Sequence, residues 1–116
     1  MTITQFYEKA GGEYSAVLNR LGSEAMIKRF VLKFPKDPGF AELAKGFSDR
    51  DAERAFRAAH TMRGICANLG FDSLFHSVSA LTESLRERSF SEEADQLFCK
   101  TAEEYRILIA NIQEIE

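Results

Sequence analysis

The chain has 116 residues, with 15 basic and 18 acidic side chains and a formal net charge of −3 at pH 7. This length allows one domain, so we expect residues 1–116 to form a single domain. The acidic balance argues against a nucleic-acid partner, because nucleic-acid-binding proteins carry a basic surface. The longest uninterrupted apolar run, residues 107–110, is far shorter than the ~20 residues that cross a bilayer, so we expect no membrane insertion.

Apolar residues recur at steps of three and four along the chain, and no segment alternates with a period of two, which predicts an all-α fold. Two short helices are expected first, over residues 4–10 and from Tyr14 to a stop at Gly22. Ser23 is expected to cap a third helix that ends before Pro35. The inward side of this third helix is expected to consist of Met26, Ile27, Phe30 and Phe34.

A fourth helix is expected to restart at Asp37-Pro38, since proline fits the first helical position. Its inward residues are expected to be Phe40, Leu43 and Phe47. Ser48 is expected to cap the fifth helix, with Asp51 as the acid of a capping box, and Gly70 to end it. The expected inward side of the fifth helix comprises Ala52, Ala55, Ala59, Met62, Cys66 and Leu69.

The sixth helix is expected to run from about Asp72 to Arg88, and Ser91 is expected to cap the last one. The inward residues are expected to be Leu74, Val78, Leu81 and Leu85 in the sixth helix, and Ala94, Leu97, Phe98, Thr101, Tyr105, Leu108, Ile112 and Ile115 in the last. Short connections force neighbouring helices to run antiparallel. The predicted fold is therefore an antiparallel up-and-down four-helix bundle with short additional N-terminal helices.

His60 is the residue of the fifth helix best placed for chemistry. At about 100° per residue, its side chain lies about 140° from the centre of the inward side, so the imidazole should point into solvent. Its helical neighbours are Phe56 at i−4, Arg63 at i+3, Gly64 at i+4 and Ala67 at i+7. A glycine inside a helix costs about 1 kcal/mol relative to alanine, and here it would clear the space beside the ring.

Arg63 and Ala67 extend this pattern. The Arg63 guanidinium suits the oxygens of a phosphoryl group, and Ala67 lengthens the cleared strip. Histidine is substantially neutral at cellular pH, and its imidazole is then a competent nucleophile. Two interpretations of His60 stay open at this point: a solvent-facing phosphoacceptor, or an ordinary surface histidine beside a tolerated glycine.

His76 is the competing histidine. It should also be exposed, but its i+3 and i+4 neighbours are Ser79 and Ala80, so it lacks an adjacent cation or glycine and we expect an ordinary surface residue. Phe56 and Phe75 flank the predicted inward sides. Each is expected either in the core or in an apolar docking rim beside the candidate acceptor.

The segment 59–70, Ala-His-Thr-Met-Arg-Gly-Ile-Cys-Ala-Asn-Leu-Gly, resembles the signature of histidine-containing phosphotransfer (HPt) domains. That signature runs His-x-x-Lys/Arg-Gly and continues with aliphatic and small residues that end in Leu-Gly. The similarity extends into Phe71-Asp72-Ser73-Leu74 and the amphipathic helix after it. Helix order and length agree across nearly the whole chain.

The resemblance implies a four-helix bundle that relays phosphoryl groups between receiver-domain aspartates in a multistep two-component phosphorelay. His60 matches the phosphorylated histidine of the family, Arg63 its basic residue, which is more often lysine, and Gly64 its clearing glycine. Such domains are phosphocarriers rather than enzymes and imply no cofactor of their own, since Mg²⁺ and the catalytic groups belong to the receiver. The implied partners are response-regulator receiver domains, with a hybrid histidine kinase as a further candidate.

Family members often place a glutamine or glutamate on the next helix, where it hydrogen-bonds the imidazole. A hairpin that pivots at Gly70-Phe71 puts His60 opposite positions 80–82, so Thr82 falls where that polar group is expected. Ser79 lies one turn earlier, and Glu83 is adjacent. The residue that orients the imidazole therefore stays open.

Cys66 and Cys99 lack the paired spacing of a disulfide framework or a zinc site, so we expect reduced core cysteines and no metal site. The N-terminal residues lack the basic and apolar regions of a signal peptide, which favours a cytoplasmic protein. We expect a free-standing monomer. Two other functions stay open: a helical protein–protein interaction module without phosphotransfer activity, and the isolated phosphoacceptor domain of a histidine kinase.

Overall fold

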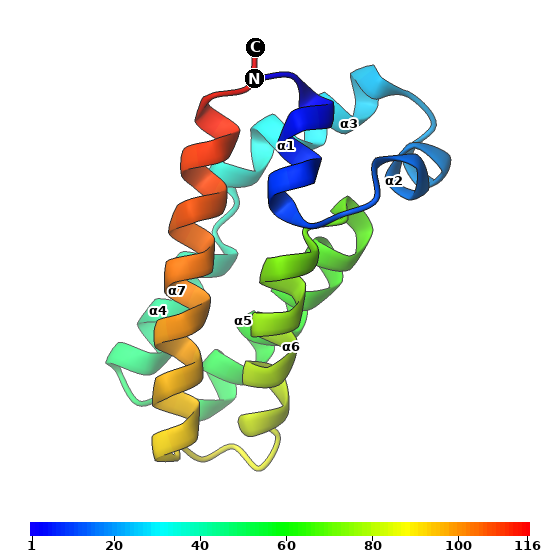
Figure 1. The fold of residues 1–116 in the computed structure, drawn as a ribbon. Helices are drawn as coiled ribbons and strands as arrows, with labels where there is room; N and C mark the ends of the chain where they lie inside the picture. The colour runs from blue at the N-terminus through cyan, green and yellow to red at the C-terminus, as the bar shows by residue number, and fades with distance from the viewer.

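The computed structural model describes residues 1–116, and all of its regular structure is helical, as predicted (Figure 1). The helices are α1 (Ile3–Ala10), α2 (Tyr14–Leu21), α3 (Glu24–Lys33), α4 (Gly39–Ser48), α5 (Ala52–Leu69), α6 (Asp72–Ser84) and α7 (Glu92–Gln113), with a 3₁₀ turn, η1 (Phe34–Lys36), between α3 and α4. None of these helices is both long and apolar enough to cross a membrane.

The bundle consists of four antiparallel helical segments: α3 with α4, then α5, α6 and α7 (Figure 1). The first segment is interrupted, because the chain runs through α3, turns at η1 and continues as α4. It returns through α5, reverses through α6 and finishes along α7, with α4 against α5, α5 against α6 and α6 against α7. α1 and α2 cover the end of the bundle where α5 passes into α6, and both chain termini lie at that end. The predicted four-helix bundle with short N-terminal helices is confirmed.

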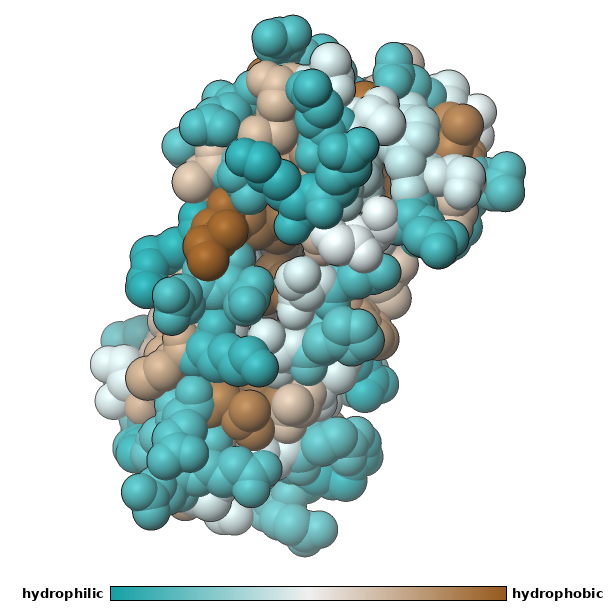
Figure 2. Space-filling model, in the orientation of Figure 1, coloured by the Kyte–Doolittle hydropathy of each residue, from teal (hydrophilic) through white to brown (hydrophobic).

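Helix α3 turns a different side inward from the predicted one. Ile27, Val31 and Phe34 are buried, whereas Met26 and Phe30 are 37% and 40% exposed, so their expected place in the core was wrong. The buried residues and the exposed apolar residues lie next to each other on the surface of α3. Periodicity alone therefore does not show which of the two sets faces the core. On the side seen in Figure 2 the surface is mainly hydrophilic, with small separate apolar patches.

Two helix ends also differ from the prediction. Ser48 is the last residue of α4 and does not cap α5; the cap is Asp51, whose carboxylate accepts a hydrogen bond from the backbone amide three residues later at 3.1 Å. Arg50 has a φ of 52°, a left-handed conformation that lets the chain turn tightly between α4 and α5. Helix α6 ends at Ser84 rather than Arg88, because Arg88 has a φ of 56° and belongs to the turn into α7.

The N-terminal helices hold the end of α5. The last carbonyl groups of a helix have no partner within it, and here side chains of α1 and α2 supply the partners. The Tyr7 hydroxyl donates to the Leu69 carbonyl at 2.7 Å in a buried position. The Arg20 guanidinium donates to the carbonyls of Ala67 at 3.2 Å and Asn68 at 3.1 Å. The C-terminal end of the helix that carries His60 is therefore fixed from outside the bundle.

Tyr7→Phe is expected to lower the free energy of unfolding by about 1–2 kcal/mol, because the Leu69 carbonyl stays buried and loses its hydrogen bond. Urea denaturation measures this change. Tyr14→Phe is the matched control: it removes a hydroxyl from an exposed hydrogen bond to Glu24 at 3.0 Å and should change stability by less than about 0.5 kcal/mol. Equal effects of the two substitutions would contradict the capping role of Tyr7.

Candidate functional site

His60 lies on the outward side of α5 and is exposed. Gly64 and Ala67, at i+4 and i+7, are exposed as well. A Cβ atom built on Gly64 would meet no atom within 4 Å, so there is open space beside the histidine. We call His60, Gly64 and Ala67 the His60 strip. Its position on the helix agrees with the outward direction predicted from the apolar spacing.

Phe56, one turn before His60, is buried beneath an arginine. Phe56 is 9% exposed, and the guanidinium carbon of Arg88 lies 3.6 Å from the centroid of its ring. The ring centroids of Phe56 and His60 are 6.1 Å apart. A guanidinium stacked on an aromatic face shields that face from water. Of the two roles considered for Phe56, the structure supports a place in the core.

Arg63 lies across from a carboxylate on α6. Its side chain is 34% exposed, and its Nη1 is 3.8 Å from Glu83 Oε1. Arg86 holds the same carboxylate more closely, donating from Nη2 to Oε1 at 2.6 Å and from Nε to Oε2 at 3.0 Å. The hydrogen bonds from Arg86, above all, lower the pKa of Glu83, and the charge of Arg63 contributes less. Glu83 is thus an ionised carboxylate shared unequally by two arginines.

A second shared carboxylate, that of Glu53, lies two turns before His60 on α5. Glu53 Oε2 accepts a hydrogen bond from Arg88 Nε at 2.7 Å, while Glu53 Oε1 is 3.5 Å from Arg57 Nε. Arg57 is at i−3 and Arg63 at i+3 of His60, so their side chains leave α5 on opposite sides of this histidine. Arg57 was not among the expected site residues, although its i, i+4 spacing from Glu53 is visible in the sequence.

Three further expected site residues lie on α6. Thr82, expected to orient the imidazole, is fully buried, and its hydroxyl donates to the Val78 carbonyl at 2.7 Å. This expectation is corrected, because Thr82 follows Val78 by one turn and shares its buried side of the helix. Ser79 is half-buried with an unpartnered Oγ, and Phe75 is half-buried against the core. The exposed polar residue next to Thr82 is Glu83.

The other nucleophilic candidates offer less than His60. Burial raises the pKa of the Cys66 thiol to about 12, so this group stays protonated at cellular pH. His76 is exposed on α6, and its ring lies edge-on to Phe75, with 5.7 Å between the centroids. His76 lacks the glycine one turn away that leaves open space beside His60.

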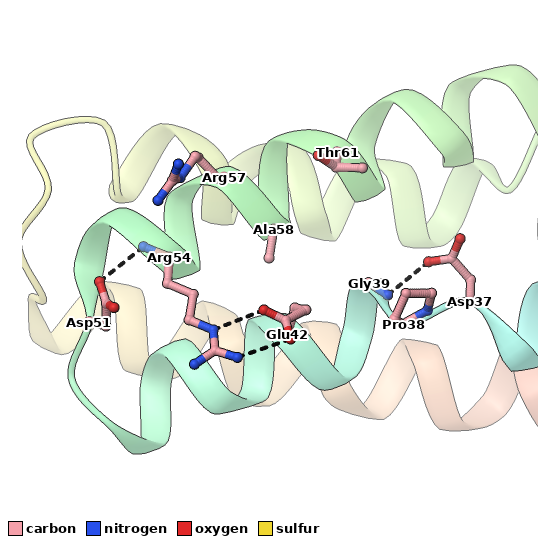
Figure 3. A pocket seen from close by; sticks show the side chains of 9 residues that line it. All are labelled: Asp37, Pro38, Gly39, Glu42, Asp51, Arg54, Arg57, Ala58 and Thr61. Atoms are coloured by element: carbon pink, nitrogen blue, oxygen red, sulfur yellow. Dashed lines mark hydrogen bonds and ion pairs between the residues drawn. The ribbon is translucent and has the colours of Figure 1, made fainter.

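His60 lies outside the largest hollows of the surface. A hollow of about 530 Å³ opens between α4 and α5 and is lined by Asp37, Pro38, Gly39, Glu42, Asp51, Arg54, Arg57, Ala58 and Thr61 (Figure 3). Its polar side chains bind one another: Arg54 donates to Glu42 at 2.8 and 2.9 Å. Another hollow, of about 560 Å³, lies between α3 and α5. Small-molecule sites are concave, so chemistry at His60 calls for a partner that supplies the surrounding walls.

Residues 26–115 match the family model of the Hpt domain, from within α3 to beyond the end of α7. No curated protein and no solved structure matches the chain. The family match spans well over half of the 116 residues and includes the His60 strip, and the helical bundle agrees with the four-helix fold of that family. The chain therefore belongs to the Hpt domain family.

Proposed function

We propose that this protein is a histidine phosphocarrier, which takes a phosphoryl group from one receiver-domain aspartate and passes it to another in a two-component phosphorelay. Domains of this family take part in histidine phosphotransfer. The observation that carries the proposal is the position of His60: it is exposed, with open space at Gly64 and a guanidinium one turn away at Arg63.

In the proposed step, the unprotonated ring nitrogen of His60 attacks the phosphorus of an aspartyl phosphate. A P–N bond forms, the P–O bond to the aspartate breaks, and the aspartate leaves as a carboxylate, while the other ring nitrogen keeps its proton. Arg63 pairs with the phosphoryl oxygens, and Gly64 leaves room for the partner. The reverse step delivers the group to the next aspartate. We assign Mg²⁺ and the catalytic groups to the receiver.

The proposal includes the setting in which the carrier works. Residues 1–116 act as one domain, which is supported by the hydrogen bonds from Tyr7 and Arg20 to the end of α5. The partners are response-regulator receiver domains and a hybrid histidine kinase, and the carrier acts as a monomer in the cytoplasm. We assign to the surface that these partners would contact Ala67, which is exposed on α5, and Phe75 and Ser79, which are half-buried on α6.

Incubation with a panel of phosphorylated receiver domains tests the proposal. We expect one acid-labile, base-stable phosphoryl group per chain, as a phosphohistidine gives, and no label from ATP alone. Receivers that bind the protein without transferring a phosphoryl group to it would contradict the proposal. That outcome would favour a helical protein–protein interaction module.

Gly64→Gln is expected to slow transfer from a phosphorylated receiver by at least about tenfold, because a long side chain would occupy the open space beside His60. Glutamine favours a helix more than glycine does, so the fold should persist. Quenched single-turnover reactions measure the rate, and circular dichroism checks the fold. Transfer at the wild-type rate would show that the open space has no role.

A further inference from the structure

Two arginines flank His60, one turn before it and one turn after it. Arg57 and Arg63 are each three residues from His60, in opposite directions, so at about 100° per residue their side chains leave α5 on opposite sides of His60. We propose that they form a two-sided clamp for a phosphoryl group on His60, and that Glu53 and Glu83 hold them while no phosphoryl group is present. This inference rests on the proposed function and extends the site beyond α5 to α6.

Each clamp arginine is held only loosely by its carboxylate. Arg57 Nε is 3.5 Å from Glu53, and Arg63 Nη1 is 3.8 Å from Glu83. Both distances exceed the roughly 2.7–2.9 Å of a close charge-assisted hydrogen bond. Arg57 is also 73% exposed, so its guanidinium is free to move. Surface pairs at such distances are weak, and a phosphoryl group can therefore draw either arginine from its carboxylate.

A second arginine keeps each carboxylate partnered when the clamp arginine leaves. Arg88 donates to Glu53 at 2.7 Å, and Arg86 donates to Glu83 at 2.6 and 3.0 Å. Arg88 is fixed further by its contact with the Phe56 ring and by its hydrogen bond to the Arg86 carbonyl at 2.6 Å. These two arginines are therefore committed to structural contacts, whereas the clamp arginines are available.

A phosphoryl group on His60 has enough charge and acceptor oxygens to bind two guanidiniums. A phosphoryl group on a side chain carries roughly two negative charges near neutral pH and presents three acceptor oxygens. One guanidinium can bind two oxygens at most, so a second cation on the opposite side has an acceptor left to bind. Gly64 follows Arg63 on the exposed face of α5, and the open space at Gly64 leaves an approach to the phosphorus.

Chemical phosphorylation with phosphoramidate tests the clamp without a partner protein. ³¹P NMR then follows the half-life of the phosphohistidine and the pKa of its phosphoryl group in Arg57→Gln, Arg63→Gln and the double variant. Each single substitution is expected to shorten the half-life by about two- to fivefold and to raise the phosphoryl pKa, and the double variant to combine both effects. Arg106→Gln is the matched control, since it removes the same charge from an exposed position on α7 and should change neither quantity.

Glu83→Gln is expected to act in the opposite direction, because it releases Arg63 to the phosphoryl group. It should lengthen the half-life in the wild-type background and have a smaller effect in the Arg63→Gln background, where Arg86 is the only arginine that it releases. An Arg57→Gln half-life equal to that of Arg106→Gln would overturn the clamp. Labelling by phosphorylated receivers is scored separately: if receivers label His60 while the arginine variants leave the half-life unchanged, the clamp fails and the phosphocarrier function stands.

Discussion

His60→Gln is expected to abolish phosphoryl transfer to the protein while leaving its helicity unchanged. The glutamine amide offers no nitrogen lone pair that attacks phosphorus, whereas its side chain is polar and compatible with an exposed helical position. His60 is exposed and its ring is 6.1 Å from that of Phe56, so its removal leaves the buried packing intact. The acid-labile label taken from phosphorylated receivers measures the loss, and circular dichroism measures the fold.

His76→Gln is the matched control for this result. His76 is exposed on the neighbouring helix, so the substitution makes the same chemical change at a second exposed histidine. Labelling should stay at the wild-type level, because its i+3 and i+4 neighbours supply neither a cation nor open space. If His60→Gln still accepts a phosphoryl group at the wild-type rate, the assignment of His60 fails and the interaction module becomes the better description.

Gly46→Ala is expected to lower the free energy of unfolding by about 3 kcal/mol, whereas Gly64→Ala should leave it unchanged or raise it by up to about 1 kcal/mol. Both substitutions add one methyl group to a helix. A Cβ atom on Gly46 would lie 2.7, 2.8 and 2.9 Å from the N, Cα and Cβ atoms of Ala55, so α4 would have to move away from α5. At Gly64 the methyl group would meet nothing within 4 Å. The only expected effect on stability is therefore the higher helix propensity of alanine.

Parallel urea denaturation of the two variants and the wild type measures whether the free energy of unfolding falls in one variant and not in the other. Equal losses of stability would contradict both the close approach of α4 to α5 and the open surface at Gly64. The measurement is independent of phosphotransfer, so it tests the packing around the candidate site without relying on the proposed function.

Local signals predicted most of the helix boundaries. Ser23 and Ser91 cap their helices with hydrogen bonds of 3.2 and 3.0 Å, and Gly70 ends α5 with a φ of 71°. Such features depend on residues three or four apart, which the sequence displays directly. The outward direction of His60 belongs with them, because the long apolar repeat of α5 determines which side of this helix is buried.

The expectations that were wrong depended on packing between elements. Val31 rather than Phe30 faces the core, because the position of α3 against α5 and α7 decides which of two neighbouring lines is covered. Thr82 was expected opposite His60, but its side chain turns to the buried side of α6. Ser48 does not cap α5, because α4 extends to this residue. None of these outcomes is encoded in a short segment of sequence.

The candidate acceptor could be predicted from local sequence spacing, whereas its charged surroundings depend on packing between helices. His60, Arg63 and Gly64 share one helix, so their spacing is enough to place them together. The ion pair from Arg63 to Glu83, by contrast, joins two helices, and its distance depends on how α6 lies against α5. Arg88 reaches Phe56 only because its left-handed backbone turns the chain back over α5.

The outward-curving surface at His60 has a kinetic consequence. A cleft can hold two reactants at once, but a single imidazole on the exposed side of a helix offers one point of attachment. If the protein carries phosphoryl groups as proposed, a donor receiver would have to depart before an acceptor receiver could reach the same atom, and successive partners would compete for it. A relay through this protein would follow a ping-pong order, in which the phosphorylated carrier exists as a free species between two encounters.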